Sequence, residues 1–177
     1  MNFWQGQVVR LRSIEPSDIQ HFIRWNLNSE RARYIDFVWP PVSQVSLMEW
    51  VEVQSRRKLE DDSFHWIIEV NDRTAVGSIS THDCNSRVGT FSYGVDIAPE
   101  HQRKGYAREA IRLVLKYYFE ELRYQKVTVP VHSDNEASLR LHERLGFQRE
   151  GVHRQMGFSR GQYFDVIWFG MTKEEFA

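Results

Sequence analysis

The 177-residue sequence has only one cysteine, Cys84, so it cannot form a disulfide within the chain. That excludes the class of small secreted domains held together by disulfides, and it suits a reducing compartment, so we expect a cytoplasmic protein. The sequence also lacks any run of 18 apolar residues, and its first residues, MNFWQGQVVRLRS, lack the apolar centre of a signal peptide. We expect neither a signal peptide nor a membrane span.

An excess of charge of one sign is absent as well. The 23 Lys and Arg residues nearly balance the 24 Asp and Glu residues, which leaves a formal net charge of −1. Proteins that bind nucleic acids usually carry a basic excess, so no nucleic-acid partner is expected. The seven histidines are scattered without the spacing of metal ligands, so the sequence predicts no metal site.

The composition is otherwise that of a folded protein. Hydrophobic residues make up 41% of the chain and aromatic residues 14%, which is enough for a hydrophobic core. No internal repeat, low-complexity tract or linker rich in Pro, Gly and Ser divides the sequence. We therefore expect a single domain over residues 1–177.

Alternating and helical patterns predict seven strands and four helices. The strands are expected at residues 8–12, 64–70, 74–81, 89–97, 126–131, 147–152 and 163–171. The helices are expected from Pro16, with a buried stripe of Ile19, Phe22, Ile23 and Leu27, over about 43–59, from Gly105 to Leu122, and over 136–145, where Gly146 ends the last helix. The helix from Gly105 joins two strands, which indicates a parallel pair in a mostly antiparallel sheet of the α/β (α+β) class.

A polar, basic segment, HQRKG, separates an apolar strand from the helix that starts at Gly105. The first turn of a helix has unpaired N–H groups and partial positive charge, so it can bind an anion such as phosphate. Gly105 would let the backbone approach the ligand closely, and Arg103 and Lys104 would add charge. The alternative is an ordinary solvated turn. The sequence matches neither a P-loop nor the dinucleotide fingerprint Gly-x-Gly-x-x-Gly.

A second polar group follows the strand at residues 126–131. Asn135 and Ser138 stand three residues apart around a helix start, where either Asp134 or Asn135 could simply cap the helix. The strand before this helix and the strand before Gly105 would be parallel neighbours. Because ligands bind at the carboxyl ends of such strands, the two polar groups could also face one crevice.

Both segments resemble signatures of the GNAT acetyltransferase superfamily. QRKGYA, Gln102 to Ala107, is similar to the family's Gln/Arg-x-x-Gly-x-Gly/Ala signature, and NEASLRLHERLGF, Asn135 to Phe147, is similar to the second signature. The tail from Glu150 to Met171 resembles the branch that acetylates ribosomal-protein N-termini and the related spermidine acetyltransferases. The resemblance extends from about Val8 to Met171. It implies a GNAT-like, mostly antiparallel sheet of about seven strands, flanked by about four helices.

The resemblance also implies acetyl-CoA as co-substrate, with no metal. The backbone N–H groups of the loop and first helical turn would hold the pyrophosphate, and this segment comprises Gln102, Arg103, Lys104, Gly105, Tyr106, Ala107 and Arg108. Val95, Asp96 and Ile97 would align with the pantetheine arm, and one strand N–H there would polarise the thioester carbonyl. Asn135 would contact the cofactor arm.

The implied chemistry is direct attack of a neutral amine on the thioester in a ternary complex. The family's tyrosine general acid corresponds to His142, whose ordinary pKa of about 6.5 suits proton donation near neutrality. Ser138 is a competing donor. Asp96 is a candidate general base. The other candidate bases are Glu69, His82 and Glu100.

The resemblance places the acceptor site at the two N-terminal helices and near the final hairpin. Aromatic residues that would form a pocket wall, or would pack in the core, are Trp25, Tyr34, Phe37 and Trp39. Asp36 and the run Glu60–Asp62 could attract a cationic amine, although a charged run is usually a solvated turn.

The expected function is N-acetylation of a primary amine, with a protein N-terminus considered first and a polyamine second. A non-catalytic acyl-CoA sensor and a simple nucleotide-phosphate binder are the alternatives from other classes. Several members of the family form dimers, so a homodimer is a further possibility that the sequence leaves open.

Overall fold

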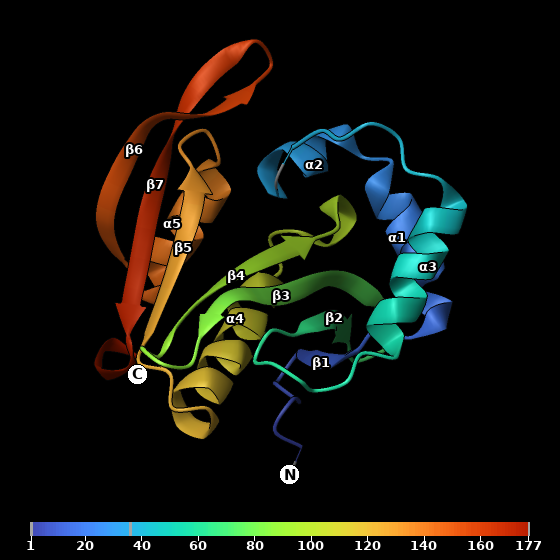
Figure 1. Cartoon of the computed structure of the whole chain (residues 1–177), viewed down its shortest axis with the longest axis horizontal. Coiled ribbons are helices and arrows are strands. Elements are labelled where there is room, and N and C mark those ends of the chain that lie inside the picture. Colours follow the sequence, from blue (N-terminus) through green and yellow to red (C-terminus); the bar gives the residue numbers. More distant parts are fainter. Residues whose placement is uncertain (1, 36, 177) are drawn as a thin grey trace. The chain divides into compact units, whose positions relative to one another are not determined.

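The computed structural model describes residues 2–35 and 37–176. This part of the chain forms a seven-stranded sheet and five α-helices (Figure 1). The strands are β1 (Val9–Ser13), β2 (His65–Val70), β3 (Ala75–Asn85), β4 (Thr90–Ile97), β5 (Lys126–His132), β6 (Gln148–Ser159) and β7 (Gln162–Thr172). The helices are α1 (Ile19–Asn26), α2 (Ser29–Ile35), α3 (Gln44–Ser55), α4 (Tyr106–Lys116) and α5 (Glu136–Leu145).

The strand order in the sheet is β1-β2-β3-β4-β5-β7-β6. Antiparallel pairs join β1 to β2, β2 to β3, β5 to β7, and β6 to β7. The pair β4–β5 is parallel, with Thr90 opposite Lys126 and Phe91 opposite Val127. Because α4 lies between these two strands in sequence, it is the crossover that a parallel pair needs. The expected mixed, mostly antiparallel α/β class is thereby confirmed.

The sequence analysis did not predict the helix α2. The sequence of α2, SERARYI, has no apolar stripe, and none of its residues is buried, so periodicity could not reveal this helix. One residue that was predicted to be buried, Leu27, is exposed. The preceding helix, α1, ends at Asn26, and Leu27 is 81% exposed instead of buried. Trp25 is the buried side chain near that end of the helix.

The strand β6 extends seven residues beyond the expected end at residue 152, through Ser159. Almost all of its side chains are exposed, so no alternation of apolar and polar residues marks its length. Two register shifts in its pairing with β7, between Arg149 and Gly151 and between His153 and Gly157, interrupt the period further. The turn into β7 contains Arg160 and Gly161, both with positive φ, as two-residue hairpin turns require.

The chain forms two compact units, one from residues 1–80 with 95–113 and the other from residues 81–94 with 114–177. The first unit contains β1, β2, the helices α1 to α3, and the first part of α4. The second contains β5, β6, β7 and α5. The strands β3 and β4 each contribute to both units. The single-domain organisation stays a prediction.

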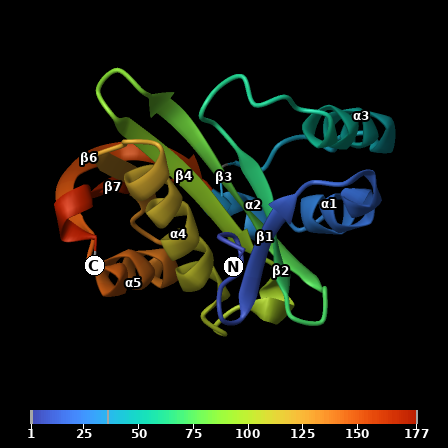
Figure 2. The same ribbon diagram turned by 90° about the horizontal axis from the view of Figure 1, so that it is seen from below.

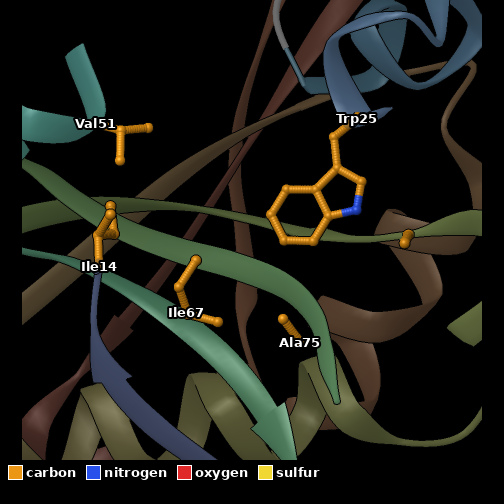
Figure 3. Packing of buried hydrophobic residues seen from close by; sticks show 6 residues of the cluster. Ile14, Trp25, Val51, Ile67 and Ala75 are labelled. Carbon is orange, nitrogen blue, oxygen red and sulfur yellow. The ribbon is translucent and has the colours of Figure 1, made fainter. Parts of the chain in front are cut away.

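The core of the first unit lies where α1 and α3 cover one side of β1 and β2 (Figure 2). Its buried members are Ile14, Trp25, Val51, Ile67, Ala75 and Ala98. Trp25 and Val51 extend from the helices toward Ile67 and Ala75 on the strands (Figure 3). Burying each larger apolar side chain contributes about 2 kcal/mol, so this cluster fixes both helices on the sheet.

The core of the second unit is aromatic. The rings of Phe91 and Tyr118 stack with their centroids 4.0 Å apart, and Tyr124 packs edge-on against Phe91. The last part of the helix that begins with α4 is a π-helical turn, Tyr117–Glu121, in which Tyr118 and Phe119 are buried. This turn therefore aims two aromatic side chains into the same core.

Candidate active site

The basic segment after β4 is anchored at both its start and its middle. The N–H of Ala98 donates to the carbonyl of Val76 over 2.8 Å, and a 3₁₀ turn follows at Pro99–His101. The side-chain amide of Gln102 then donates to the carbonyl of Ile97 over 3.0 Å. The first bond ties the start of the loop to β3, and the second folds the loop back on the end of its own strand, β4.

The loop then turns into α4 with its backbone donors free of intrahelical partners. Arg103 and Gly105 both have positive φ, 62° and 83°. The first helical bond is from the N–H of Glu109 to the carbonyl of Gly105, so the N–H groups of the three preceding residues come before the helical ladder begins. A Cβ at Gly105 would meet no heavy atom within 4 Å. Open space beside backbone donors at a helix start fits a phosphate group.

All seven predicted cradle residues lie in this one loop and first helical turn. Gln102, Arg103, Lys104, Gly105 and Arg108 are exposed, whereas Tyr106 and Ala107 are half-buried. Glu109 points the other way and accepts hydrogen bonds from the backbone N–H groups of Gln7 and Val8. The acidic side chain of the first turn is therefore bound to the N-terminal segment.

The end of β4 carries the three residues expected beside the thioester, Val95, Asp96 and Ile97, and all three are half-buried. On the neighbouring strand, a Cβ at Gly77 would collide with the carbonyl oxygen of Asp96. Only glycine permits this approach of β3 to β4, which makes Gly77 part of the support of the expected pantetheine strand.

The carboxylate of Asp96 forms an ion pair with Arg31 of α2, in which both side chains are nearly buried. Arg31 also donates to the carbonyl of Trp25 over 3.1 Å, and its guanidinium lies 5.4 Å from the centre of the Trp25 ring. Burial raises the pKa of Asp96 above its ordinary value, and Arg31 opposes that shift. A carboxyl with a raised pKa is a stronger base, which suits the role expected of Asp96.

The other candidate bases have partners of their own. Glu69 is buried and accepts from Arg10 and from Arg12, whose Nε lies 2.6 Å from it. Arg12 also binds the buried Asp18, so Glu69 belongs to a charged network that accounts for its place inside an apolar strand.

The remaining two candidates lie at the surface. Glu100 is 3.5 Å from Arg24, and His82 is 3.0 Å from Asp83, and these side chains are about half exposed or more.

In the second unit, Asn135 caps α5. Its Oδ1 accepts from the N–H of Ser138 over 3.1 Å, and its own N–H donates to His132. Gly146 ends the same helix with a φ of 93°. The capping interpretation and the helix stop are therefore both confirmed, whereas the contact of Asn135 with the cofactor stays a prediction.

His142 is buried and only 2% exposed. Its Nδ1 lies 2.8 Å from the carbonyl oxygen of Ser138 and 3.3 Å from the Ser138 hydroxyl. Its Nε2 lies 2.9 Å from the hydroxyl of Tyr93 on β4. The ring stacks on Phe169, and Phe147 contacts it edge-on. Burial lowers the pKa of His142, so the ring is held neutral.

The aromatic residues expected at the acceptor site divide into two groups. Trp25 is in the core, while Tyr34, Phe37 and Trp39 are between 43% and 67% exposed. Asp36 lies outside the described residues. Of the acidic run, Asp61 pairs with Arg57 over 2.7 Å and accepts from the N–H of Ser63 over 2.8 Å, as expected for a turn.

Sequence reasoning missed Arg31, Gly77 and Tyr93. Arg31 is on the helix that periodicity did not reveal. Tyr93 lies within a predicted strand without a motif around it, and its partner His142 is 49 residues away. Only Gly77 had a signal in the sequence, because a glycine within a predicted strand often marks a close approach of another backbone.

Among the described residues, no three or more His, Cys, Asp and Glu side chains are grouped so that they could hold a metal ion. The helices of the described chain are all too short or too polar to cross a membrane.

Comparison with known sequences places these features in context. The family model described as "Acetyltransferase (GNAT) domain" matches residues 9–148. The chain is 43% identical over 176 residues to the SPbeta prophage-derived uncharacterized N-acetyltransferase YokL of Bacillus subtilis, covering 99% of this chain and 96% of that protein. It is 30% identical over 156 residues to the spermidine N(1)-acetyltransferase of Vibrio cholerae, covering 88% of each.

Two further comparisons concern the ribosomal-protein and spermidine acetyltransferase branch of the family and the fold of the chain. The chain is 26% identical to the protein named "Putative ribosomal N-acetyltransferase YdaF" of Bacillus subtilis, over 94% of this chain and 92% of that protein. The solved structure of spermidine N-acetyltransferase from Vibrio cholerae in complex with CoA and spermine has a TM-score of 0.84 at 24% identity, covering 96% of this chain and 98% of that one. The two chains thus have the same fold.

Proposed function

This chain belongs to the GNAT acetyltransferase family, and from that premise we propose that its acceptor is the N-terminal amine of a peptide or protein. The family resemblance drawn from QRKGYA and NEASLRLHERLGF is confirmed. The protein is an N-acetyltransferase that uses acetyl-CoA, which favours an enzyme over the acyl-CoA sensor and the nucleotide-phosphate binder.

The observation that carries the acceptor proposal is the segment Phe37–Met48, hereafter the apolar segment. Its sequence, FVWPPVSQVSLM, contains no charged residue. Six of its side chains are apolar and 46% to 67% exposed, namely Phe37, Val38, Trp39, Val42, Val45 and Met48. Clustered exposed apolar side chains usually mark a surface that binds a partner.

A peptide N-terminus fits the apolar segment better than a polyamine does. A polyamine carries several cations along its length, so it needs several carboxylates along its path. A peptide brings one amine, followed by backbone and side chains that apolar and aromatic residues can pack against. The rings of Phe37 and Trp39 meet edge-to-face with centroids 6.1 Å apart, which forms an aromatic pair for such packing.

A polyamine is the second candidate, because one relative of 30% identity is named a spermidine acetyltransferase. The nearby acidic side chains that could serve it are partly neutralised in this chain. Glu52 pairs with Arg56 over 2.7 Å, and Asp61 pairs with Arg57. These pairs reduce the negative charge available to a cationic ligand.

The proposed roles in catalysis follow the predicted site. The cradle at Gln102–Arg108 would hold the pyrophosphate through backbone N–H groups, with Asn135 contacting the cofactor arm. A backbone N–H of the Val95–Ile97 strand would polarise the thioester carbonyl, and Asp96 would accept the proton of the attacking ammonium. Ser138 or His142 would donate to the departing sulfur. The homodimer and the cytoplasmic location also stay predictions.

The test is a panel of amines assayed by release of free CoA. The panel contains spermidine and short peptides whose first two residues are either apolar or charged. We expect peptides with apolar residues to have the highest kcat/KM. Trp39→Ala should raise the peptide KM about tenfold with little change in kcat, because it removes binding made equally in the ground and transition states.

Leu59→Ala is the matched control, since Leu59 is 85% exposed and lies outside the apolar segment. The control should leave the peptide KM unchanged. A higher kcat/KM for spermidine than for every peptide would overturn the acceptor proposal in favour of a polyamine. Equal effects of the Trp39 and Leu59 substitutions would remove the apolar segment from the acceptor site.

A further inference from the structure

Three polar side chains of the second unit form a continuous hydrogen-bonded chain. Tyr93 on β4 reaches Nε2 of His142 over 2.9 Å, and Nδ1 of His142 reaches the Ser138 hydroxyl over 3.3 Å. Tyr93 and His142 are each only 2% exposed, whereas Ser138 is half-buried. Of these three hydrogen-bonded side chains, only Ser138 therefore approaches the surface.

The directions of these hydrogen bonds are fixed by one carbonyl group. Nδ1 of His142 lies 2.8 Å from the backbone oxygen of Ser138, which can only accept. Nδ1 must therefore carry the ring proton. In a neutral ring Nε2 then has a lone pair, so the Tyr93 hydroxyl must donate to it.

The same tautomer determines what the Ser138 hydroxyl can do. Because the Nδ1–H of His142 points at both Ser138 oxygens, the hydroxyl oxygen is an acceptor toward the histidine. Its own hydrogen is then available for a bond directed away from the ring. Each member of the chain thus donates to the next, in the order Tyr93, His142, Ser138.

We propose that Tyr93 and His142 are positioning residues, which orient the Ser138 hydroxyl as the donor to the departing sulfur of CoA. The inference rests on the donor role proposed above for this site, and it selects Ser138 over His142 for direct contact. A chain of donors that all point one way is strengthened by mutual polarisation. No proton has to pass along it, since a hydrogen bond to the thiolate is enough to stabilise the leaving group.

Burial supports this reading of the two inner residues. Burial raises the pKa of Tyr93 well above its ordinary value, so its hydroxyl keeps its hydrogen throughout the physiological range. Burial also favours the neutral form of His142. Both side chains consequently remain in the protonation states that the chain requires.

The test measures the pKa of the CoA thiol when CoA is bound to the enzyme. The ultraviolet absorbance of the thiolate is recorded while the pH is raised. A hydroxyl that donates to the thiolate makes the bound thiol more acidic. We expect Ser138→Ala to lower the acid dissociation constant of the bound thiol about tenfold, and Tyr93→Phe to lower it about threefold. Both variants should lower kcat more than they change the KM for acetyl-CoA.

Phe147→Leu is the control, because Phe147 contacts the His142 ring without a hydrogen bond. It should leave the acidity of the bound thiol unchanged even if it lowers stability. An unchanged acidity in Ser138→Ala, or equal effects of Tyr93→Phe and Phe147→Leu, would overturn the proposal. The titration needs only CoA, so a wrong choice of acceptor amine would not alter its result.

A second measurement needs no variant. Nitrogen NMR of the unmodified protein should show His142 protonated at Nδ1, with Nε2 accepting a hydrogen bond, and Tyr93→Phe should shift the Nε2 resonance toward that of an unbonded nitrogen. The opposite tautomer would overturn the order of donors.

Discussion

Gly105 is the residue on which the cofactor site depends most directly, because backbone and open space meet there. We predict that Gly105→Glu weakens CoA binding at least 100-fold, since a carboxylate would occupy the position of a phosphate. Positive φ costs the new side chain about 1 kcal/mol, so the protein should remain folded. Isothermal titration calorimetry with CoA measures the affinity.

Gly161→Glu is a matched control for this substitution. Gly161 has a φ of 76°, and a Cβ there would also meet nothing within 4 Å, but it lies in the turn between β6 and β7. The control should lose similar stability and keep its CoA affinity. If both variants bind CoA normally, the loop at Gln102–Arg108 is not the pyrophosphate site.

At this scale the sequence reveals residues that act on the backbone close to them in the chain. Asn135 at a helix start and Gly146 at a helix end were predictable, because capping depends on neighbours a few residues away. The burial of His142 was not predictable, since it depends on Tyr93 and Phe169, which reach it from distant strands. Local patterns contain no information on such partners.

At the scale of elements, the Arg31–Asp96 pair joins α2 to the end of β4. We predict that Asp96→Asn lowers kcat about 100-fold and keeps the CoA affinity, because it removes the proposed base. Breaking this nearly buried pair should also lower the free energy of unfolding by roughly 3 kcal/mol. Steady-state kinetics from pH 5 to 9 and urea unfolding measure the two effects.

Arg31→Met separates the two roles of Asp96. It breaks the same ion pair but keeps the carboxylate, and it removes the group that lowers the pKa of Asp96. A base is active when deprotonated, so the acidic limb of the kcat profile should move to higher pH in this variant. An acidic limb that stays in place, together with full activity of Asp96→Asn, would exclude Asp96 as the base.

The elements with a clear period were predictable and α2 was not. The helices α1, α3, α4 and α5 bury one face, so burial imposes a repeat on their sequences. None of the residues of helix α2 is buried, so burial imposes no repeat on its sequence. Arg31, which pairs with Asp96, was missed together with this helix.

At the scale of the whole molecule, histidines that are fully or partly buried make stability depend on pH. Burial lowers the pKa of His21, His65 and His142, and that of His65 falls to about 4. Between pH 6.5 and 4 the unfolded chain therefore binds protons that the folded chain does not, so the free energy of unfolding decreases as the pH is lowered. His65 alone should account for about 3 kcal/mol below pH 4. The raised pKa of Asp96 opposes this trend.

Urea unfolding at pH 7.5, 6, 5 and 4 measures this dependence. His65 packs against Trp50 with ring centroids 5.5 Å apart, so His65→Leu keeps an apolar contact and removes the titrating ring. This variant should show a shallower loss of stability, whereas substitution of the surface residue His82 by Leu should not. Equal slopes in both variants would contradict the assignment to His65.

The long strand β6, at the edge of the sheet, bears on whether the protein aggregates at high concentration. An open strand edge is a template on which other chains can add β-structure and aggregate. The two register shifts at Arg149–Gly151 and His153–Gly157 divide this edge into short segments that no straight strand can follow. We therefore expect the two register shifts to hinder fibril growth from this edge, and a variant with a straightened β6 to form fibrils more readily although its sheet is more regular.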